Sequence, residues 1–251
     1  MQGVRAVVTG SGGGMGGAIA LRLAQEGADI ALNDRVAGAT DRWQEQIAPL
    51  GGDVFAVTTN VTRRSGAEEF INAALDRWGR IDVLVNVVGG VRGPVVNPVW
   101  EISEEDFEFS WGINMRATFH CTQLVLPAMM ERKAGKIVNI ASNSWAGEPM
   151  HAHYSAAKAA VVSFTRSCAI QLGPYNINVN AVAPGGTQTN EHNTGDWDAP
   201  TFETMYETGG TLGRFNTGED IANAVLYLAS EESRNVSGQL LTVAAGANPR
   251  L

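Results

Sequence analysis

The sequence contains little cysteine, and this shortage excludes two kinds of site. Its 251 residues include two cysteines, Cys121 and Cys168, which lie far apart in segments with an apolar, helical pattern. They form neither a disulfide framework nor a CxxC motif, so we expect both thiols to be reduced and buried in the core. The four histidines do not have the HExxH spacing, and the sequence therefore predicts no metal site.

Long hydrophobic runs and excess positive charge are also missing. No run approaches the ~18 consecutive apolar residues of a membrane-spanning helix. The first residues, MQGVRAVVTG, do not show the pattern of a signal peptide. Lys and Arg number 18 against 26 Asp and Glu, and the formal net charge of -8 repels a phosphate backbone. We therefore expect a cytoplasmic protein that binds a small molecule rather than nucleic acid or a membrane.

Glycine is plentiful, and charged residues are scarce. Glycine accounts for 29 residues without a G-X-Y period, which excludes collagen and favours tight turns and close contacts between backbone and ligand. Charged residues make up 18% of the chain, against about 25% in an average soluble domain, which favours buried contacts between subunits. The sequence shows no linker or internal repeat, and we expect one domain spanning residues 1–251.

Short apolar runs alternate with longer segments of helical periodicity. Strands are predicted at residues 5–9, 30–33, 54–58, 83–86, 136–141, 178–183 and 240–243. Helices are predicted at residues 15–26, 41–50, 67–78, 104–132, 154–172 and 219–229, with a break in the fourth near Gly112. Alternating strands and helices form right-handed βαβ units, and strands that are apolar throughout are buried on both faces. The sequence therefore predicts an α/β fold, a single doubly wound parallel sheet of about seven strands with helices on both faces.

A glycine-rich turn follows the first predicted strand. Residues 9–16 read TGSGGGMG, and the backbone amides of such a turn and of the helix after it bind a pyrophosphate. An ordinary strand-to-helix turn is the alternative, since glycine is common there. The predicted cofactor contacts in this turn are Gly10, Ser11, Gly13, Gly14, Met15 and Gly16.

An acidic residue stands at the end of the second predicted strand. Asp34 follows Gly16 at a distance suited to a carboxylate that accepts hydrogen bonds from the ribose hydroxyls of an adenine dinucleotide. Because the same carboxylate would repel a 2′-phosphate, Asp34 favours NAD over NADP. Arg35 is the counterargument, since arginine pairs with that phosphate. A solvated loop acid is the alternative interpretation of Asp34.

Tyr154 and Lys158 are spaced to share one face of a helix. A free phenol titrates near ~10, and a neighbouring ammonium favours the phenolate. The pair can therefore act as an acid–base unit. Taken alone this spacing is common, and coincidence is the alternative.

These motifs, in this order and spacing, resemble the short-chain dehydrogenase/reductase family. The resemblance covers essentially the whole chain. It rests on TGSGGGMG at residues 9–16, NVVG at 86–89, Asn114, Ser142, YSAAK at 154–158 and NAVAPG at 180–185. It implies a Rossmann-type fold and an NAD-dependent oxidoreductase that interconverts a secondary alcohol and a ketone by hydride transfer.

The resemblance also implies four catalytic residues. Asn114 would hold a water of the proton relay, and Ser142 would orient the substrate oxygen. Tyr154 would accept the alcohol proton, while Lys158 would stabilise the phenolate and hold the nicotinamide ribose. Ser144 is a nearby competitor for Ser142, whose distance along the chain from Tyr154 is one residue shorter than the commonest spacing.

Further cofactor contacts are implied, with two departures from the family pattern. Asn60 replaces the aspartate of an Asp-Val pair that contacts the adenine, and NVVG replaces the usual NNAG. The implied contacts are Asn60, Val61, Asn86, Gly89, Tyr154, Lys158, Pro184, Gly185, Thr187 and Thr189.

Substrate recognition is assigned to the loops around this centre. The irregular stretch at residues 184–217 is interpreted as a substrate lid, because loops of this length are usually functional. The runs NVVGG at 86–90 and APGGT at 183–187 resemble the branch that oxidises cis-dihydrodiols of cyclohexadiene carboxylates. We expect a cyclic or aromatic-derived substrate, with Arg92 either paired to its carboxylate or solvated. The other predicted substrate contacts are Ser144, Trp145, His151 and His192, while His153 is either a pocket residue or structural.

Two other functions remain as alternatives. A 3-oxoacyl-(acyl-carrier-protein) reductase would normally use NADP and present a basic surface, so Asp34 and the net charge weigh against it. A dinucleotide-binding redox sensor without turnover would not need the four catalytic residues.

Subunit assembly is predicted from two helical segments. Residues 104–132 and 154–172 are apolar on more than one side, and only one side can face the sheet. We expect partner subunits to cover the other side, forming a homotetramer with dihedral symmetry, as the family resemblance also implies.

Overall fold

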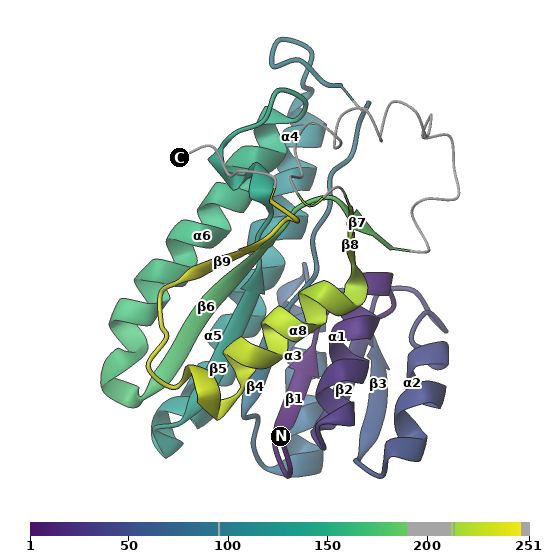
Figure 1. The fold of residues 1–251 in the computed structure, drawn as a ribbon, viewed down its shortest axis with the longest axis vertical. Coiled ribbons are helices and arrows are strands. Elements are labelled where there is room, and N and C mark those ends of the chain that lie inside the picture. Colours follow the sequence, from purple (N-terminus) through teal and green to yellow (C-terminus); the bar gives the residue numbers. More distant parts are fainter. Residues whose placement is uncertain (95, 190–211, 213, 247–251) are drawn as a thin grey trace.

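Seven parallel strands form the central sheet of the computed structural model, in the order β3–β2–β1–β4–β5–β6–β9 (Figure 1). The structure describes residues 1–94, 96–189, 212 and 214–246. The strands of this sheet are β1 (Arg5–Val8), β2 (Asp29–Asp34), β3 (Val54–Thr58), β4 (Val83–Asn86), β5 (Gly135–Ile140), β6 (Ile177–Pro184) and β9 (Leu240–Val243). Two short strands, β7 (Thr187–Gln188) and β8 (Asn216–Thr217), pair separately. The predicted seven-stranded parallel sheet is confirmed.

Helices cover both faces of the sheet, as predicted. One face carries α1 (Gly14–Gln25), α2 (Asp41–Ile47) and α8 (Gly218–Ala229), and the other carries α3 (Arg64–Trp78), α5 (Ala117–Arg132) and α6 (Ala152–Leu172). α4 (Glu104–Trp111) leads into α5 through a π-helical turn, η2 (Gly112–Arg116). Short 3-10 turns are η1 (Ala48–Leu50), η3 (Asn143–Ala146), η4 (Gly173–Tyr175) and η5 (Glu231–Ser233).

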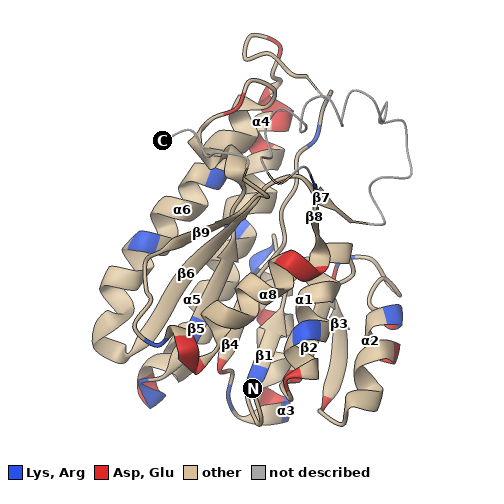
Figure 2. Cartoon of the chain, in the orientation of Figure 1, with Lys and Arg blue, Asp and Glu red and all other residues tan. Residues whose placement is uncertain are grey.

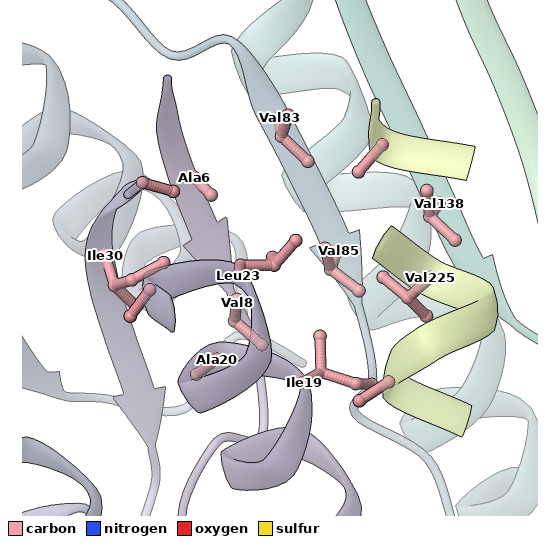
Figure 3. Close-up of a cluster of buried hydrophobic side chains, with 14 of the residues drawn as sticks. Ala6, Val8, Ile19, Ala20, Leu23, Ile30, Val83, Val85, Val138 and Val225 are labelled. Carbon is pink, nitrogen blue, oxygen red and sulfur yellow. The ribbon is translucent and has the colours of Figure 1, made fainter. Parts of the chain in front are cut away.

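The alternation of side chains along each strand divides the core into two layers. Ala6 and Val8 of β1 lie in the cluster beneath α1 and α8, whereas Val7 lies in the cluster beneath α3 and α5. Figure 3 shows the first cluster, in which Ile19 and Leu23 of α1 lie over the strands. Complete burial of a side chain such as Leu23 contributes about 1.5–3 kcal/mol relative to leaving it exposed. An all-apolar strand is therefore stabilised from both faces.

Two helical segments show how local sequence sets the ends of elements. The helix predicted over residues 41–50 ends at Ile47 and continues as η1, because Pro49 lacks an amide hydrogen and Gly51 adopts a φ of 87°. The break predicted near Gly112 is confirmed, since α4 and α5 are separated there by the π-helical turn. That turn carries Asn114.

Both cysteines are buried and free of disulfide bonds. Burial raises the pKa of the Cys121 thiol to about 12 and that of the Cys168 thiol to about 11. The prediction of reduced core residues is confirmed. In the described ranges, no helix has the length and apolar character to cross a membrane. The same ranges contain no cluster of three or more His, Cys, Asp or Glu placed to hold a metal ion.

The order of the strands determines where a ligand can bind. The chain builds outward from β1 to β3, then returns to place β4 on the other side of β1. In open α/β sheets, ligands bind at the carboxyl ends of the strands beside such a reversal. The turns that follow β1, β2, β4 and β5 meet at this edge, which is the upper edge of the sheet in Figure 1.

Candidate active site

The glycine-rich turn connects β1 to α1, and several of its glycines have no room for a side chain. Gly10 adopts a φ of 63°, and a Cβ there would lie 3.2 Å from the Val88 side chain. A Cβ on Gly16 would collide with the Gly10 carbonyl. The first turn of α1, which includes Met15, carries no acidic residue, so its amides leave a partial positive charge at this edge. These features suit an anion such as a pyrophosphate.

The carboxylate at the end of β2 lies directly against this turn. A Cβ on Gly12 would lie 2.6 Å from Asp34 Oδ2, while Asp34 Oδ1 accepts a hydrogen bond from the Val36 amide at 3.0 Å. Arg35, beside it, is exposed. Gly12 was missing from the predicted contacts, although it belongs to the same glycine run.

Four predicted cofactor contacts have side chains that are occupied elsewhere. The Ser11 hydroxyl is fully buried and bonds to the backbone of β2. Asn60 Oδ1 accepts bonds from the amide and hydroxyl of Thr62, and Val61 is buried in the core. Asn86 donates to Asn139 Oδ1 at 2.8 Å inside the sheet. Ser11, Val61 and Asn86 can therefore serve a ligand at this edge chiefly through their backbones.

Asn114 and Lys158 meet at the segment that follows β4. A Cβ on Gly89 would lie 2.6 Å from Asn114 Oδ1 and 2.8 Å from Lys158 Nζ. Asn114 is 1% exposed; its side chain accepts from the Gly90 amide at 3.1 Å and donates to the carbonyls of Gly90 and Ser110, both at 2.8 Å. Three bonds therefore fix the orientation of this amide.

Lys158 lies beneath the ring of Tyr154 on the same face of α6. Its Nζ is 5.7 Å from the centroid of the Tyr154 ring and donates to the Ile140 carbonyl at 2.9 Å. Lys158 is 3% exposed, and this burial lowers the pKa of its ammonium from 10.5 to about 7. A lysine with such a pKa both carries charge and exchanges protons near neutral pH.

Ser142 follows β5 at the same edge. Its Oγ accepts a hydrogen bond from the Ser144 amide at 3.2 Å, which fixes the side chain at the start of η3. Ser144 thus contacts Ser142 through its backbone. The structure brings Asn114, Ser142, Tyr154 and Lys158 to one edge of the sheet, on η2, the end of β5 and α6.

The segment after β6 closes over the glycine-rich turn. The Gly185 amide donates to the Val243 carbonyl at 2.8 Å, and Thr187 donates to the Gly185 carbonyl at 2.9 Å. A Cβ on Gly14 would lie 3.1 Å from Thr189 Cβ. Pro184 ends β6 and is buried. Residues 184–189, 212 and 214–217 of the predicted lid are described; the rest, including His192, lies outside the described residues.

The remaining predicted substrate contacts have partners within the chain or lie in the loops. Arg92 pairs with Glu105 at 2.8 Å and with Asp106 at 2.9 Å. Trp145 is half-buried beside the cluster between β6 and α6, and its indole Nε1 has no hydrogen-bond partner among the described residues. His151 is 8% exposed and contacts Glu148 and the Pro94 carbonyl.

Sequence reasoning missed several residues that build this edge. The Thr9 hydroxyl accepts from the amides of Val87 and Val88 at 3.0 Å and 3.3 Å, tying the segment after β4 to the end of β1. The Ile140 carbonyl, which binds Lys158, was also missed. Backbone acceptors leave no signal in a sequence, and Thr9 had been considered only as part of the glycine motif.

Comparisons with known proteins match the chain over almost its whole length. A protein family described as enoyl-(acyl carrier protein) reductase matches residues 10–248. The (2S)-[(R)-hydroxy(phenyl)methyl]succinyl-CoA dehydrogenase subunit BbsD of Thauera aromatica is 37% identical over 241 residues, covering 96% of this chain and 95% of its own. The 3-oxoacyl-(acyl-carrier-protein) reductase FabG of Thermotoga maritima is 34% identical over 254 residues, covering 98% of each chain.

Solved structures share the fold. A 7α-hydroxysteroid dehydrogenase complexed with NADH and 7-oxo glycochenodeoxycholic acid superposes with a TM-score of 0.91 and 33% identity, covering 100% of this chain and 96% of its own. An NAD+-bound xylitol dehydrogenase superposes with a TM-score of 0.90 and 28% identity, covering 98% of this chain and 99% of its own.

Proposed function

The chain belongs to the short-chain dehydrogenase/reductase family and is an oxidoreductase that acts on alcohols or ketones; from that premise we propose that it uses NAD and converts a secondary alcohol on a small, ring-bearing substrate to a ketone, or the reverse. The geometry around Gly89 is the observation that supports this proposal most directly. Lys158 and Asn114 converge on the backbone at Gly89, beside the ring of Tyr154.

The residues at the carboxyl edge suit a dinucleotide. The glycine-rich turn and the first turn of α1 offer amides to a pyrophosphate, and Gly89 leaves room where a Cβ would collide with Asn114 and Lys158. Asp34 stands where the adenosine ribose would lie, and its charge would repel a 2′-phosphate, which favours NAD. Bound NAD would supply the hydride-accepting ring.

Tyr154 and Lys158 handle the proton in this mechanism. In the oxidising direction, the Tyr154 phenolate oxygen accepts the hydroxyl proton of the substrate. The Lys158 ammonium stabilises that phenolate, and its pKa of about 7 lets it exchange a proton near neutral pH. Asn114 positions the water that connects Lys158 to solvent, and Ser142, held by the Ser144 amide, orients the substrate oxygen.

A ring-bearing substrate is favoured by the residues at the mouth of the site and by the relatives. Trp145 and the valines at positions 87, 88 and 91 offer apolar surface at this edge. The names of two similar proteins, the hydroxy(phenyl)methylsuccinyl-CoA dehydrogenase and the hydroxysteroid dehydrogenase, describe secondary alcohols on ring-bearing compounds. To bind a carboxylate on the substrate ring, Arg92 would have to release its ion pair with Glu105, whose side chain is 81% exposed.

A second candidate is a 3-oxoacyl-(acyl-carrier-protein) reductase. The observation that favours it is the similarity to FabG over 98% of the chain. Such an enzyme would use the same acid–base residues on a thioester-linked ketone. Asp34 weighs against the NADP that we expect for it.

One experiment separates these candidates. The purified protein is assayed with NAD and NADP against cyclic, aromatic and straight-chain secondary alcohols, and in reverse with a 3-oxoacyl thioester. We expect NAD reduction with ring-bearing alcohols to have the highest kcat/KM. Preference for NADPH and the thioester would favour the reductase. Tight NAD binding without any turnover would favour a redox sensor.

We also propose a homotetramer. Large apolar side chains are exposed on the outer surfaces of the predicted contact helices, including Phe107 and Trp111 of α4, Phe119 of α5 and Ile170 of α6. A partner subunit would remove these side chains from water. Light scattering at micromolar concentration tests this proposal, and a monomer would contradict it.

A further inference from the structure

The loop that enters α6 contains a buried histidine with an acceptor at each ring nitrogen. His151 Nδ1 lies 3.2 Å from Glu148 Oε1, and Nε2 lies 3.0 Å from the Pro94 carbonyl oxygen. Neither an ionised carboxylate nor a carbonyl can donate a hydrogen bond. Both ring nitrogens must therefore donate, and a histidine does so only as an imidazolium.

His151 lies at the start of a helix, where a positive charge is unfavourable. His151 is the N-cap residue of α6 and makes no capping hydrogen bond through its side chain. A helix N-terminus carries partial positive charge and favours Ser, Thr, Asp or Asn at this position. The Glu148 carboxylate offsets that disadvantage, because its hydrogen bond raises the pKa of His151 above the ordinary value. Burial lowers this pKa, and the hydrogen bond to the Pro94 carbonyl raises it further.

Pro94 belongs to the outer segment that follows β4. Residues 91–94 and 96 are exposed, so core packing does not hold this segment in place. Gly90 is bonded through its amide and its carbonyl to Asn114 at one end. The Asn97 amide donates to the Met150 carbonyl at 2.9 Å at the other end. Between these two ties lie the bond from His151 to Pro94 and the ion pairs of Arg92 with Glu105 and Asp106 of α4.

We propose that His151 is a positioning residue: as an imidazolium held by Glu148, it pins the segment of residues 90–94 to the start of the helix that carries Tyr154. This segment begins beside Gly89, where Asn114 and Lys158 meet, so its position sets one wall of the substrate site. The link to substrate rests on the proposed function, whereas the charge and contacts of His151 do not.

Other titratable groups face His151 from the elements packed around it. The ring of His153 lies 6.0 Å from that of His151; His153 is 4% exposed and has no hydrogen-bond partner among the described residues. The first turn of α4, red in Figure 2, contributes Glu105 and Asp106, and both pair with Arg92.

Histidine NMR on the full chain tests the charge directly. The protein contains four histidines, and glutamine substitutions at positions 120, 151 and 153 assign their ring signals. We expect His151 to keep both ring protons above pH ~6.5, the ordinary value for histidine. Glu148→Gln should lower its pKa, while His120, whose pKa burial lowers, serves as an internal reference. A single ring proton on His151 at neutral pH would overturn the proposal.

Hydrogen exchange tests the pinning. In His151→Gln and in Glu148→Gln, we expect the amides of residues 90–93, 96 and 97 to exchange about tenfold faster, as for loss of a hydrogen bond to a charged group, while β1 and α1 stay unchanged. Glutamine at position 148 keeps an acceptor of similar size, so its effect reports charge rather than packing. His120→Gln is the matched control. Unchanged exchange in both variants at the outer segment would contradict the pinning.

Kinetics with the best alcohol from the panel separates positioning from folding. We expect KM for the alcohol to rise about tenfold in either variant, with kcat and the KM for NAD within about twofold of wild type. In the double variant, which carries both His151→Gln and Glu148→Gln, KM for the alcohol should be no higher than in each single variant, because both substitutions disrupt the same pair of side chains. Additive increases in KM in the double variant, or a fall in kcat without an increase in KM, would overturn the proposal. A wild type without alcohol turnover would refute the proposed function, and NMR and exchange would still decide the role of His151.

Discussion

Replacing Gly89 by alanine is expected to disrupt the proposed acid–base centre while the sheet stays folded. The new Cβ would lie 2.6 Å from Asn114 Oδ1 and 2.8 Å from Lys158 Nζ, closer than the 3.0 Å that real Cβ atoms respect. Neither side chain can yield freely. Lys158 is buried and bonded to the Ile140 carbonyl, and Asn114 holds three hydrogen bonds.

The expected losses differ in size for activity and stability. Gly89 itself is exposed, but its new methyl group would crowd two buried side chains, and overpacking of this kind costs about 1–3 kcal/mol. For a chain of this length, each kcal/mol lowers the Tm by about 2–4 °C, so the variant should remain folded at 25 °C. Displacing Lys158 from Tyr154 impairs acid–base catalysis, which contributes about 10²–10⁴-fold to the rate. We therefore expect kcat to fall about 10²-fold or more.

Gly90→Ala is the matched control for this prediction. A Cβ on Gly90 would meet the Ile113 side chain at 3.8 Å, an ordinary contact. Both variants are assayed for NADH production with a ring-bearing alcohol, for NADH binding by fluorescence and for Tm. If Gly89→Ala keeps a kcat within about twofold of Gly90→Ala, the convergence at Gly89 is not the catalytic centre.

Three further predictions concern charge. Because folding lowers the pKa of Lys158 from 10.5 to about 7, the unfolded chain binds more protons than the folded chain between these pH values, and the free energy of unfolding should rise with pH across that window. Urea titrations should show a smaller rise of this free energy with pH in Lys158→Met than in the wild type. An equal rise in both proteins would contradict the lowered pKa of Lys158. Asp34→Ser should raise the ratio of kcat/KM for NADP to that for NAD about tenfold, because the repulsion of a 2′-phosphate is removed and Arg35 is adjacent; a wild type that already prefers NADP would show that Asp34 has another role. Arg92→Ala should raise KM about tenfold for ring carboxylates but not for neutral ring alcohols; equal KM values for wild type and variant would exclude Arg92 from the pocket.

The sheet could be predicted from sequence because its signals are local. Residues 54–58, 83–86 and 240–243 were predicted with the bounds that β3, β4 and β9 have, since each is a short run of mostly apolar residues between turn residues. The parallel sheet with helices on both faces followed from the alternation of strands with helices and the handedness of the crossovers, whereas the strand order was not predicted. The same reasoning located the glycine-rich turn and Asp34 at one edge.

The contacts within the site could not be predicted, because they join residues far apart in sequence. Nothing local shows that the hydroxyl of Ser11 bonds to β2, or that Arg92 pairs with Glu105 and Asp106. The side chain of Asn114, in the π-helical turn, bonds to the backbone of Gly90 in the loop after β4. His151 was weighed as a pocket residue from its place in the chain alone, and its acceptor Pro94 becomes visible only once the loop after β4 lies beside the start of α6.

We propose that Tyr154 is the acid–base group of an NAD-dependent alcohol dehydrogenase. The most direct test is the steady-state rate of NADH formation by Tyr154→Phe with the best alcohol of the panel, measured alongside NAD affinity. Phenylalanine keeps the ring beside Lys158 and removes the oxygen that accepts the proton. We expect Tyr154→Phe to lower kcat about 10²–10⁴-fold and to retain its affinity for NAD; a near-wild-type kcat would show that Tyr154 is not the acid–base group.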